Sequence, residues 1–200
     1  MQISFRPVTQ DDVPFLWDML FHAGQLAKEG ATSSEAAKNN PHVRKYAEGW
    51  GRHGDVGVIA YDANNSNLLG AAWLRLLTGD PSHYGYYDDK TPELAIAVQP
   101  EWAGKGVGSA MLSALIEQVK HEVPGIVLTV RNENPAKRLY EKFGFQVIGE
   151  VVNRVYLISG VVTPTATIPP TPTNTLPVTD TATPTSTPAF TPTATPTAGG

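Results

Sequence analysis

Three alternate glycines, Gly104, Gly106 and Gly108, stand where a strand-like apolar run gives way to a helix-like one. Glycine has no Cβ atom, so a ligand can approach the backbone amides at the start of the expected helix. Those amides lack partners within a helix and carry its positive partial charge, which favours an anion such as a pyrophosphate. Lys105 can add a point charge. The pattern indicates an anion site, with tight packing of helix on strand as the alternative explanation.

Two nucleotide-binding motifs do not fit these glycines. A phosphate loop of the NTPase kind needs Gly-Lys followed by Ser or Thr, whereas Gly106 follows Lys105 here. A dinucleotide-binding fingerprint places its first glycine directly after the strand and an acidic residue about twenty positions later. Here residues 100–103 separate the strand from Gly104, and Glu133 is the nearest acid after the next strand. We expect neither motif.

A second motif with chemical potential runs from Asn132 to Phe145. It reads as a short helix that carries Tyr140 on its apolar stripe and ends at Gly144, because glycine tolerates the positive φ of a helix C-terminal cap. Phe145 would then pack back on the helix. A phenol close to an anion site is available for proton transfer, and the alternative for Tyr140 is a core aromatic residue.

Strands and helices in a recognisable order must position these two motifs. Residues 94–98 and 126–130 are continuous apolar runs, as expected of strands covered on both faces, and a helical stripe at 111–119 lies between them. This order predicts a right-handed parallel crossover. The remaining expected elements are a strand at 3–8, a helix after Thr9–Asp12, a helical region at 34–50 broken near Pro41, a hairpin of 56–61 with 68–77, a long loop at 78–92, and a closing hairpin of 146–151 with 154–158.

These elements predict an α/β fold with a mixed sheet. The strands are antiparallel in the first half and parallel at the centre, and helices cover both faces. Residues 1–160 form the expected folded domain. Residues 161–200 are nearly all Thr, Pro, Ala and Ser, with Asp180 as their one charge. Such a tail has too little apolar surface to offset the entropy of ordering it, so we expect it to be disordered.

Composition narrows the function further. A formal net charge of −4 gives no basic footprint for nucleic acid. The chain has no cysteine, which excludes disulfides and thiolate zinc sites, and its five histidines show no metal-ligand spacing. No apolar run has the length of a membrane span or of a secretory h-region. We therefore expect a cytoplasmic protein without a metal site, a membrane partner or a nucleic-acid partner.

Residues 3 to about 158 resemble the GNAT superfamily of acyl-CoA-dependent N-acyltransferases. The resemblance lies in the opening segment Arg6–Asp12, in the strand, proline and glycine segment 93–108, and in the segment 134–145. It implies a GNAT-like sheet whose two central parallel strands splay apart around acetyl-CoA. Family members usually carry Arg or Gln at the position of Ala103, so this chain would lose one side-chain contact with the cofactor while keeping the amide cradle.

The resemblance also implies roles for individual residues. The pantetheine arm would bond along Ile96, Ala97 and Val98, and the pyrophosphate would lie on the turn and helix start formed by Gly104, Lys105, Gly106, Val107, Gly108 and Ser109. Either Asn132 or Asn134 would contact the cofactor, and we favour Asn134. Tyr140 would protonate the leaving thiolate, while the backbone N–H of Val98 would stabilise the oxyanion. Glu93 is the best candidate for the base, with a solvated carboxylate at the strand end as the alternative.

Acceptor recognition in this fold comes from the first helices and from the loop before the central strand. Aromatic and acidic residues there, which would suit a cationic amine, are Trp50, Trp73, Tyr86 and Asp88. A solvated loop with half-buried aromatics is the alternative. The expected function is direct transfer of an acetyl group from acetyl-CoA to a primary amine of a small molecule or peptide. The alternative is a non-catalytic acyl-CoA-binding sensor or assembly module, and the expectation allows for a homodimer.

Overall fold

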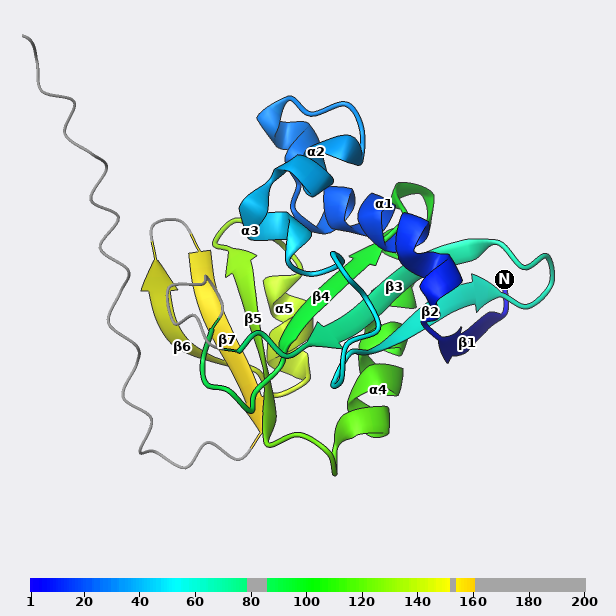
Figure 1. Cartoon of the computed structure of the whole chain (residues 1–200). Helices are drawn as coiled ribbons and strands as arrows, with labels where there is room; N and C mark the ends of the chain where they lie inside the picture. The colour runs from blue at the N-terminus through cyan, green and yellow to red at the C-terminus, as the bar shows by residue number, and fades with distance from the viewer. Residues whose placement is uncertain (79–85, 152–153, 161–200) are drawn as a thin grey trace, which may run out of the picture.

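The computed structural model describes residues 1–78, 86–151 and 154–160. Within them one mixed sheet has the strand order β1-β2-β3-β4-β5-β7-β6, and it is strongly twisted (Figure 1). The strands are β1 (Ile3–Pro7), β2 (Val56–Asp62), β3 (Leu68–Arg75), β4 (Glu93–Val98), β5 (Gly125–Arg131), β6 (Gln146–Val151) and β7 (Arg154–Gly160).

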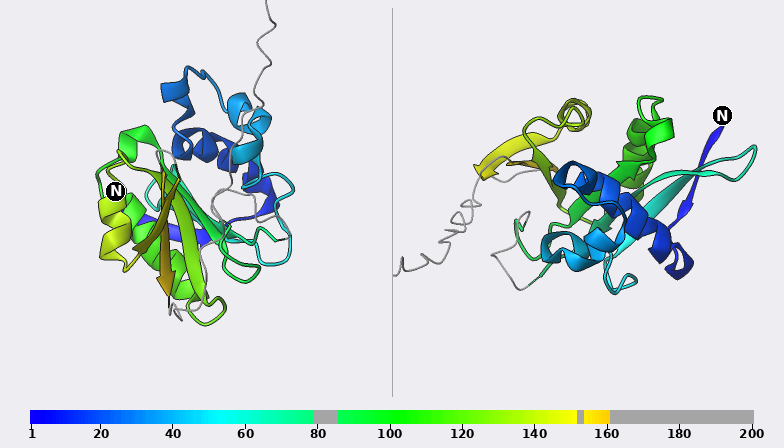
Figure 2. Two further views of the ribbon diagram at one scale, coloured as in Figure 1. Left: turned by 90° about the vertical axis from the view of Figure 1, so that its left-hand side faces the viewer. Right: turned by 90° about the horizontal axis from the view of Figure 1, so that it is seen from above.

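Helices cover both faces of the sheet, as the sequence predicts (Figure 2). On one face lie α1 (Val13–Ala23), α2 (Glu35–Asn39) and α3 (Pro41–Arg44), and on the other lie α4 (Val107–Val119) and α5 (Lys137–Lys142). Short 3₁₀ turns, η1 (Gln10–Asp12), η2 (Leu26–Glu29) and η3 (Pro100–Trp102), precede or follow these helices. Each face therefore has its own apolar core, one around α1 and one around α4.

The pairing of the strands confirms the mixed sheet. Strands β1 to β4 are antiparallel neighbours, and β4 and β5 are parallel. The expected closing hairpin is present, but its second strand, β7, lies beside β5, while β6 forms the edge. The predicted hairpin of β2 and β3 is also present, and the helical region at 34–50 is reduced to α2 and α3 around Pro41. There the Asn40 side chain accepts a hydrogen bond from the backbone N–H of His42.

The first helix is fixed to β1 by a buried carboxylate. Asp12 accepts hydrogen bonds from the Arg6 guanidinium at 2.6 and 2.7 Å and from the backbone N–H of Thr9 at 2.8 Å. The hydrogen bond from Arg6, followed by those from Thr9, lowers the pKa of Asp12 to about 2. These contacts orient the start of α1, whose residues Leu16, Met19 and Leu20 are buried against the sheet.

The crossover helix α4 lies close to the sheet because β3 has a glycine beneath it. A Cβ atom at Gly70 would come within 2.5 Å of the carbonyl oxygen of Ala97 and 3.0 Å of Met111 Cε. The buried stripe of α4 is made of Val107, Met111, Leu112, Leu115 and Val119, which is the helical spacing expected from the sequence.

Two sequence predictions fall outside the described residues. They are residues 79–85 of the long loop predicted at 78–92, and the whole of the predicted Thr/Pro-rich tail, residues 161–200. Within the described ranges, no helix combines the length and the apolar character needed to cross a bilayer.

Candidate functional site

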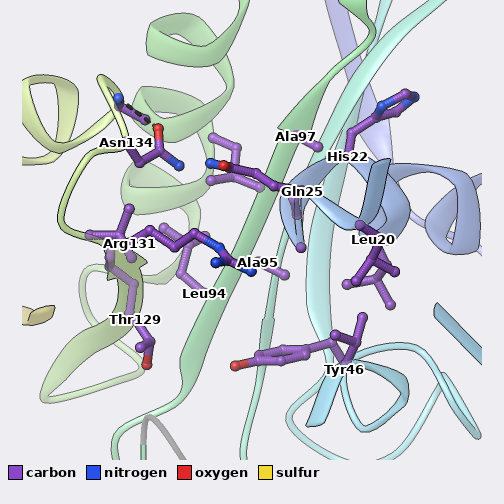
Figure 3. A pocket seen from close by; sticks show the side chains of 18 of the residues that line it. Leu20, His22, Gln25, Tyr46, Leu94, Ala95, Ala97, Thr129, Arg131 and Asn134 are labelled. Atoms are coloured by element: carbon purple, nitrogen blue, oxygen red, sulfur yellow. Dashed lines mark hydrogen bonds between the residues drawn. The ribbon is translucent and has the colours of Figure 1, made fainter. Parts of the chain in front are cut away.

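The central parallel strands β4 and β5 separate soon after they begin. Their pairing register contains Glu93 opposite Val127, and β4 then runs on to Val98 without a partner on its β5 side. Between the diverging strands lies a cavity of about 710 Å³. Its walls are the later residues of β4 and β5, the segment from α1 through η2, and residues next to α3 and α5 (Figure 3).

The start of α4, which follows Ala103 of the cavity wall, presents free backbone donors, although residues 104–109 do not themselves line the cavity. The N–H groups of Gly106, Val107, Gly108 and Ser109 donate to no acceptor in the part of the chain that the structure describes. Ala103, just before the turn, lines the cavity. Four such amides at the positive end of a 13-residue helix form a binding site for an anion.

The three glycines serve two different purposes. Gly104 and Gly106 have φ angles of 73° and 82°, and a Cβ atom at either would meet nothing within 4 Å. They are therefore required by backbone conformation. Gly108 is different, because its Cβ position lies 3.5 Å from Val98 Cγ2 and 3.6 Å from Leu139 Cδ2, so it permits close packing. The tight packing considered from the sequence therefore applies to Gly108, whereas Gly104 and Gly106 are explained by their positive φ angles.

Lys105 has a defined place beside the turn. Its Nζ lies 4.5 Å from the centroid of the Trp102 ring, within the range of a cation–π contact. Trp102 therefore packs on the glycine turn and holds a positive charge next to the free amides.

Tyr140 lies in the wall of the cavity, at the side of α5. Its ring packs against Phe145, with 5.9 Å between the centroids, and the backbone N–H of Phe145 donates to the carbonyl of Tyr140 at 3.1 Å. Gly144, with φ of 79°, makes that reversal possible and confirms the predicted C-terminal cap. The Tyr140 hydroxyl has no hydrogen-bond partner among the described residues. Burial raises the pKa of Tyr140 to about 12, so the phenol stays protonated at neutral pH.

Glu93 is not a solvated carboxylate at a strand end. It is only 2 % exposed, and its Oε1 accepts hydrogen bonds from the Tyr46 hydroxyl at 2.5 Å and from Thr129 Oγ1 at 3.1 Å. Lys45 Nζ lies 3.3 Å from Oε2. Glu93 itself does not line the cavity, but Tyr46 and Thr129 do. The carboxylate is therefore linked to the cavity by hydrogen bonds from these two hydroxyl groups.

The backbone around Tyr46 is held from β3. The indole N–H of Trp73 donates to the carbonyl oxygen of Tyr46 at 2.8 Å. The fully buried guanidinium of Arg75 donates to the carbonyls of Lys45 at 2.9 Å and Glu48 at 2.7 Å, and it pairs with Asp55 at 2.8 Å. These bonds fix the position of the Tyr46 hydroxyl relative to Glu93.

The four residues expected to recognise the acceptor do not line the cavity. Trp73 is completely buried, and Trp50 packs in the same core with its ring 5.8 Å from Arg75 Cζ. The Tyr86 hydroxyl donates to Asp89 at 3.0 Å, and Asp88 accepts from the backbone N–H groups of Lys90 and Thr91 at 2.8 and 2.7 Å. The tryptophans thus support the core and the aspartate shapes a turn.

Of the two candidate asparagines, the structure places Asn134 in the cavity wall. Its Oδ1 accepts a hydrogen bond from the backbone N–H of Ala136 at 3.0 Å. This bond orients the Asn134 side chain within the short turn before α5. Ile96, Ala97 and Val98 line the same cavity from β4. The structure therefore brings the β4 residues, Asn134 and Tyr140 to one cavity, together with Ala103 at the entry to the glycine turn.

Several polar residues of the cavity wall were not singled out from the sequence, among them Tyr46 and Thr129 beside Glu93, and also Gln25, Glu29 and Arg131. Gln25 adopts a left-handed conformation with φ of 54°, and its Oε1 is buried without a hydrogen-bond partner among the described residues. Glu29 of η2 accepts a hydrogen bond from Arg131 at the end of β5. The one sequence signal for Arg131 is its place between the second apolar strand and the motif that follows. Nothing local marks Gln25 or Glu29.

The cavity has no metal-binding arrangement in the residues that can be described. Across the described ranges, no group of three or more His, Cys, Asp and Glu side chains is placed to hold a metal ion.

Comparison with known proteins agrees with this geometry. A family model described as an acetyltransferase (GNAT) domain matches residues 53–147. Mycothiol acetyltransferase of Brachybacterium faecium is 29 % identical over 111 residues, which cover 54 % of this chain and 31 % of that protein. The match therefore spans about a third of the length of this curated relative.

Solved structures with the same fold include two N-acetyltransferases in complex with ligands. PaiA N-acetyltransferase from Thermoplasma acidophilum, in complex with coenzyme A, has a TM-score of 0.57 and 17 % identity over 80 % of this chain and 99 % of its own. Spermidine N-acetyltransferase from Vibrio cholerae, in complex with CoA and spermine, has a TM-score of 0.56 and 20 % identity over 79 % of this chain and 95 % of its own. At such identities the likeness establishes the fold.

Proposed function

We propose, from the premise that this chain belongs to the GNAT family of acetyltransferases, that it transfers an acetyl group directly from acetyl-CoA to a primary amine. We assign this activity to residues 1–160. The relatives named above are acetyltransferases by their descriptions, and the two solved structures are described as N-acetyltransferases, which supports an amine as the acceptor.

The cofactor would lie along the splay of β4 and β5. The pyrophosphate would accept hydrogen bonds from the free amides of Gly106 to Ser109, next to the Lys105 ammonium. The pantetheine arm would bond to the open edge of β4 from Ile96 to Val98, and Asn134 would contact it from the opposite side. This route leads the thioester to the part of the cavity that Tyr140 lines.

One backbone group on this route is suited to stabilise the oxyanion. The N–H of Gln99 donates to the carbonyl of Leu69 on β3 at 2.9 Å. Successive N–H groups of an extended strand point to opposite sides, so the N–H of Val98 faces the cavity. A donor fixed in that direction stabilises the negative charge that develops on the thioester oxygen.

The reaction needs two proton movements. The amine nitrogen attacks the thioester carbon, the C–S bond breaks, and an amide and CoA result. Tyr140, protonated at neutral pH, supplies the proton for the leaving thiolate. The proton lost by the amine passes through the hydroxyl of Tyr46, or of Thr129, to the buried carboxylate of Glu93.

The observation that carries this proposal is the row of free amides at the mouth of α4, beside a strand edge that has no partner. The test measures thiol release from acetyl-CoA with a panel of primary amines and identifies the product by mass spectrometry. We expect CoA and acetylated amine in equal amounts. Tight CoA binding with no turnover for any amine would instead favour a non-catalytic acyl-CoA sensor.

A further inference from the structure

The cavity wall that faces the acceptor carries a guanidinium with unused hydrogen-bond donors. Arg131 extends from the end of β5 across the cavity toward Ala95 (Figure 3). Its side chain is only 17 % exposed, and it donates to Glu29 alone among the residues that the structure describes. A guanidinium has five N–H donors, and those not directed at Glu29 are available to a ligand in the cavity.

The charge of this wall is balanced. Glu29 is the only carboxylate among the described residues that line the cavity, and it is already paired with Arg131. The other carboxylate nearby, Glu93, lies behind the wall and is paired with Lys45. A polycationic acceptor would therefore meet no unpaired negative charge here, and burying such a charge without a partner is costly.

A second polar group points into the same space. Gln25 reaches into the cavity from the wall opposite Arg131 (Figure 3), and its Oε1 is buried without a hydrogen-bond donor in the described part of the chain. A buried acceptor without a partner costs free energy unless a ligand supplies a donor. An acceptor molecule with an N–H group would supply one.

We propose that Arg131, Glu29 and Gln25 form the acceptor subsite and that it takes a molecule with a carboxylate next to its amine, an α-amino acid with an apolar side chain. The carboxylate would lie on the free donors of Arg131, and an amine N–H would donate to Gln25 Oε1. The apolar wall next to them is formed by Leu20, Leu26, Val43 and Leu94. This inference rests on the proposed acetyl transfer and names its acceptor class.

The experiment compares L-phenylalanine with phenethylamine, which lacks only the carboxylate. For the native chain we expect kcat/KM to be about 10- to 100-fold higher with L-phenylalanine, the range for a charge-assisted hydrogen bond. Arg131→Gln should abolish that preference by raising the KM for L-phenylalanine, while the KM for phenethylamine and the CoA affinity stay unchanged. Arg131→Lys should restore part of it, because the charge remains without the fork of donors.

A matched control removes an arginine outside the cavity. Arg44 on α3 is half exposed and pairs with Glu48, so Arg44→Gln makes the same charge change without touching the wall. We expect this variant to keep the preference for L-phenylalanine. A native preference for phenethylamine or spermidine, or an equal loss with both amines in Arg131→Gln, would overturn the proposal. Weakened CoA binding in Arg131→Gln would overturn it too, because Arg131 would then serve the cofactor.

Binding of the product separates this inference from the proposed function. N-acetyl-L-phenylalanine is titrated calorimetrically into the native chain and into Arg131→Gln, with CoA present. Saturable binding that the substitution weakens by about 10-fold or more supports the subsite even if no amine is acetylated. Binding that the substitution leaves unchanged, or no binding at all, contradicts it, whether or not other amines are acetylated.

Discussion

The hydroxyl of Tyr46 donates a hydrogen bond of 2.5 Å to Oε1 of Glu93, although the two residues lie 47 positions apart. Glu93 sits behind the cavity wall and Tyr46 forms part of that wall. In the proposed reaction, a proton from the acceptor would therefore reach the carboxylate without direct contact between the amine and Glu93. The Tyr46 hydroxyl therefore offers a path for protons between the cavity and the buried Glu93 carboxylate, which does not line the cavity itself.

Replacing Tyr46 with Phe should lower kcat by about 10- to 100-fold, because the proton route through its hydroxyl is removed. The pH–rate profile measures this, and we expect it to differ from the native profile in both Tyr46→Phe and Glu93→Gln. Thr129→Val removes the longer bond to the same oxygen, at 3.1 Å, and should act more weakly. Glu93→Gln with an unchanged profile would remove the base assignment.

Tyr140→Phe should reduce kcat by roughly 100-fold while the affinity for CoA remains the same, because a general acid acts at the transition state and not in cofactor binding. The pKa of Tyr140 is raised to about 12, so the phenol is protonated throughout the usual assay range. The native rate should accordingly show no loss from this group below about pH 11. Full activity of Tyr140→Phe would contradict its role as the acid.

Gly106→Ala should weaken CoA binding and lower stability by about 1–2 kcal/mol, because alanine at a φ of 82° is strained and the adjacent amides would shift. Gly54 has a similar φ of 87°, and its Cβ position meets only Leu76, at 3.8 Å. Gly54→Ala is therefore a control that should cost similar stability and leave CoA affinity intact. Calorimetric titration and chemical denaturation measure the two quantities separately. Equal CoA affinity in both variants would argue against the amide site.

Asp12→Ala should destabilise the fold by about 1–2 kcal/mol, because the Arg6 guanidinium and the Thr9 N–H lose the carboxylate that they bind. Because the pKa of Asp12 is lowered to about 2 from 3.8, its contribution is complete above about pH 4 and is lost as the pH falls toward 2. Urea denaturation of both proteins at pH 7 and at pH 2 tests this. The difference between them should shrink at the lower pH, whereas a constant difference would mean that its charge contributes nothing.

Local features explain why part of the site could be predicted from the sequence. The glycine turn and the segment that ends at Gly144 are short, and their conformation follows from φ angles and helix ends that residue types reveal. The parallel crossover likewise follows from the order of apolar runs. The order of β7 and β6 at the edge does not follow from the sequence, because either strand of the closing hairpin could pair with β5.

The part of the cavity wall that contains Arg131, Glu29 and Gln25 depends on contacts that sequence patterns do not encode. Arg131 donates a hydrogen bond to Glu29, which lies 102 positions away in the sequence. The indole N–H of Trp73 likewise donates to the distant carbonyl of Tyr46. The sequence predicts that aromatic residues near a loop recognise the acceptor. Trp50 and Trp73 instead bury their large side chains in the core that contains residues of α1 and β3. The tertiary path of the chain between α1 and β2, and not composition, decides which side chains face the cavity.

The most direct test of the central claim compares the binding of CoA and pantetheine to the native chain by calorimetry. The two ligands share the arm that would lie on β4, but only CoA has the diphosphate that would lie on the amides of α4. We expect saturable CoA binding below about 1 mM and at least ~100-fold weaker binding of pantetheine, as loss of several charge-assisted hydrogen bonds requires. Equal affinities, or no heat with CoA, would contradict it.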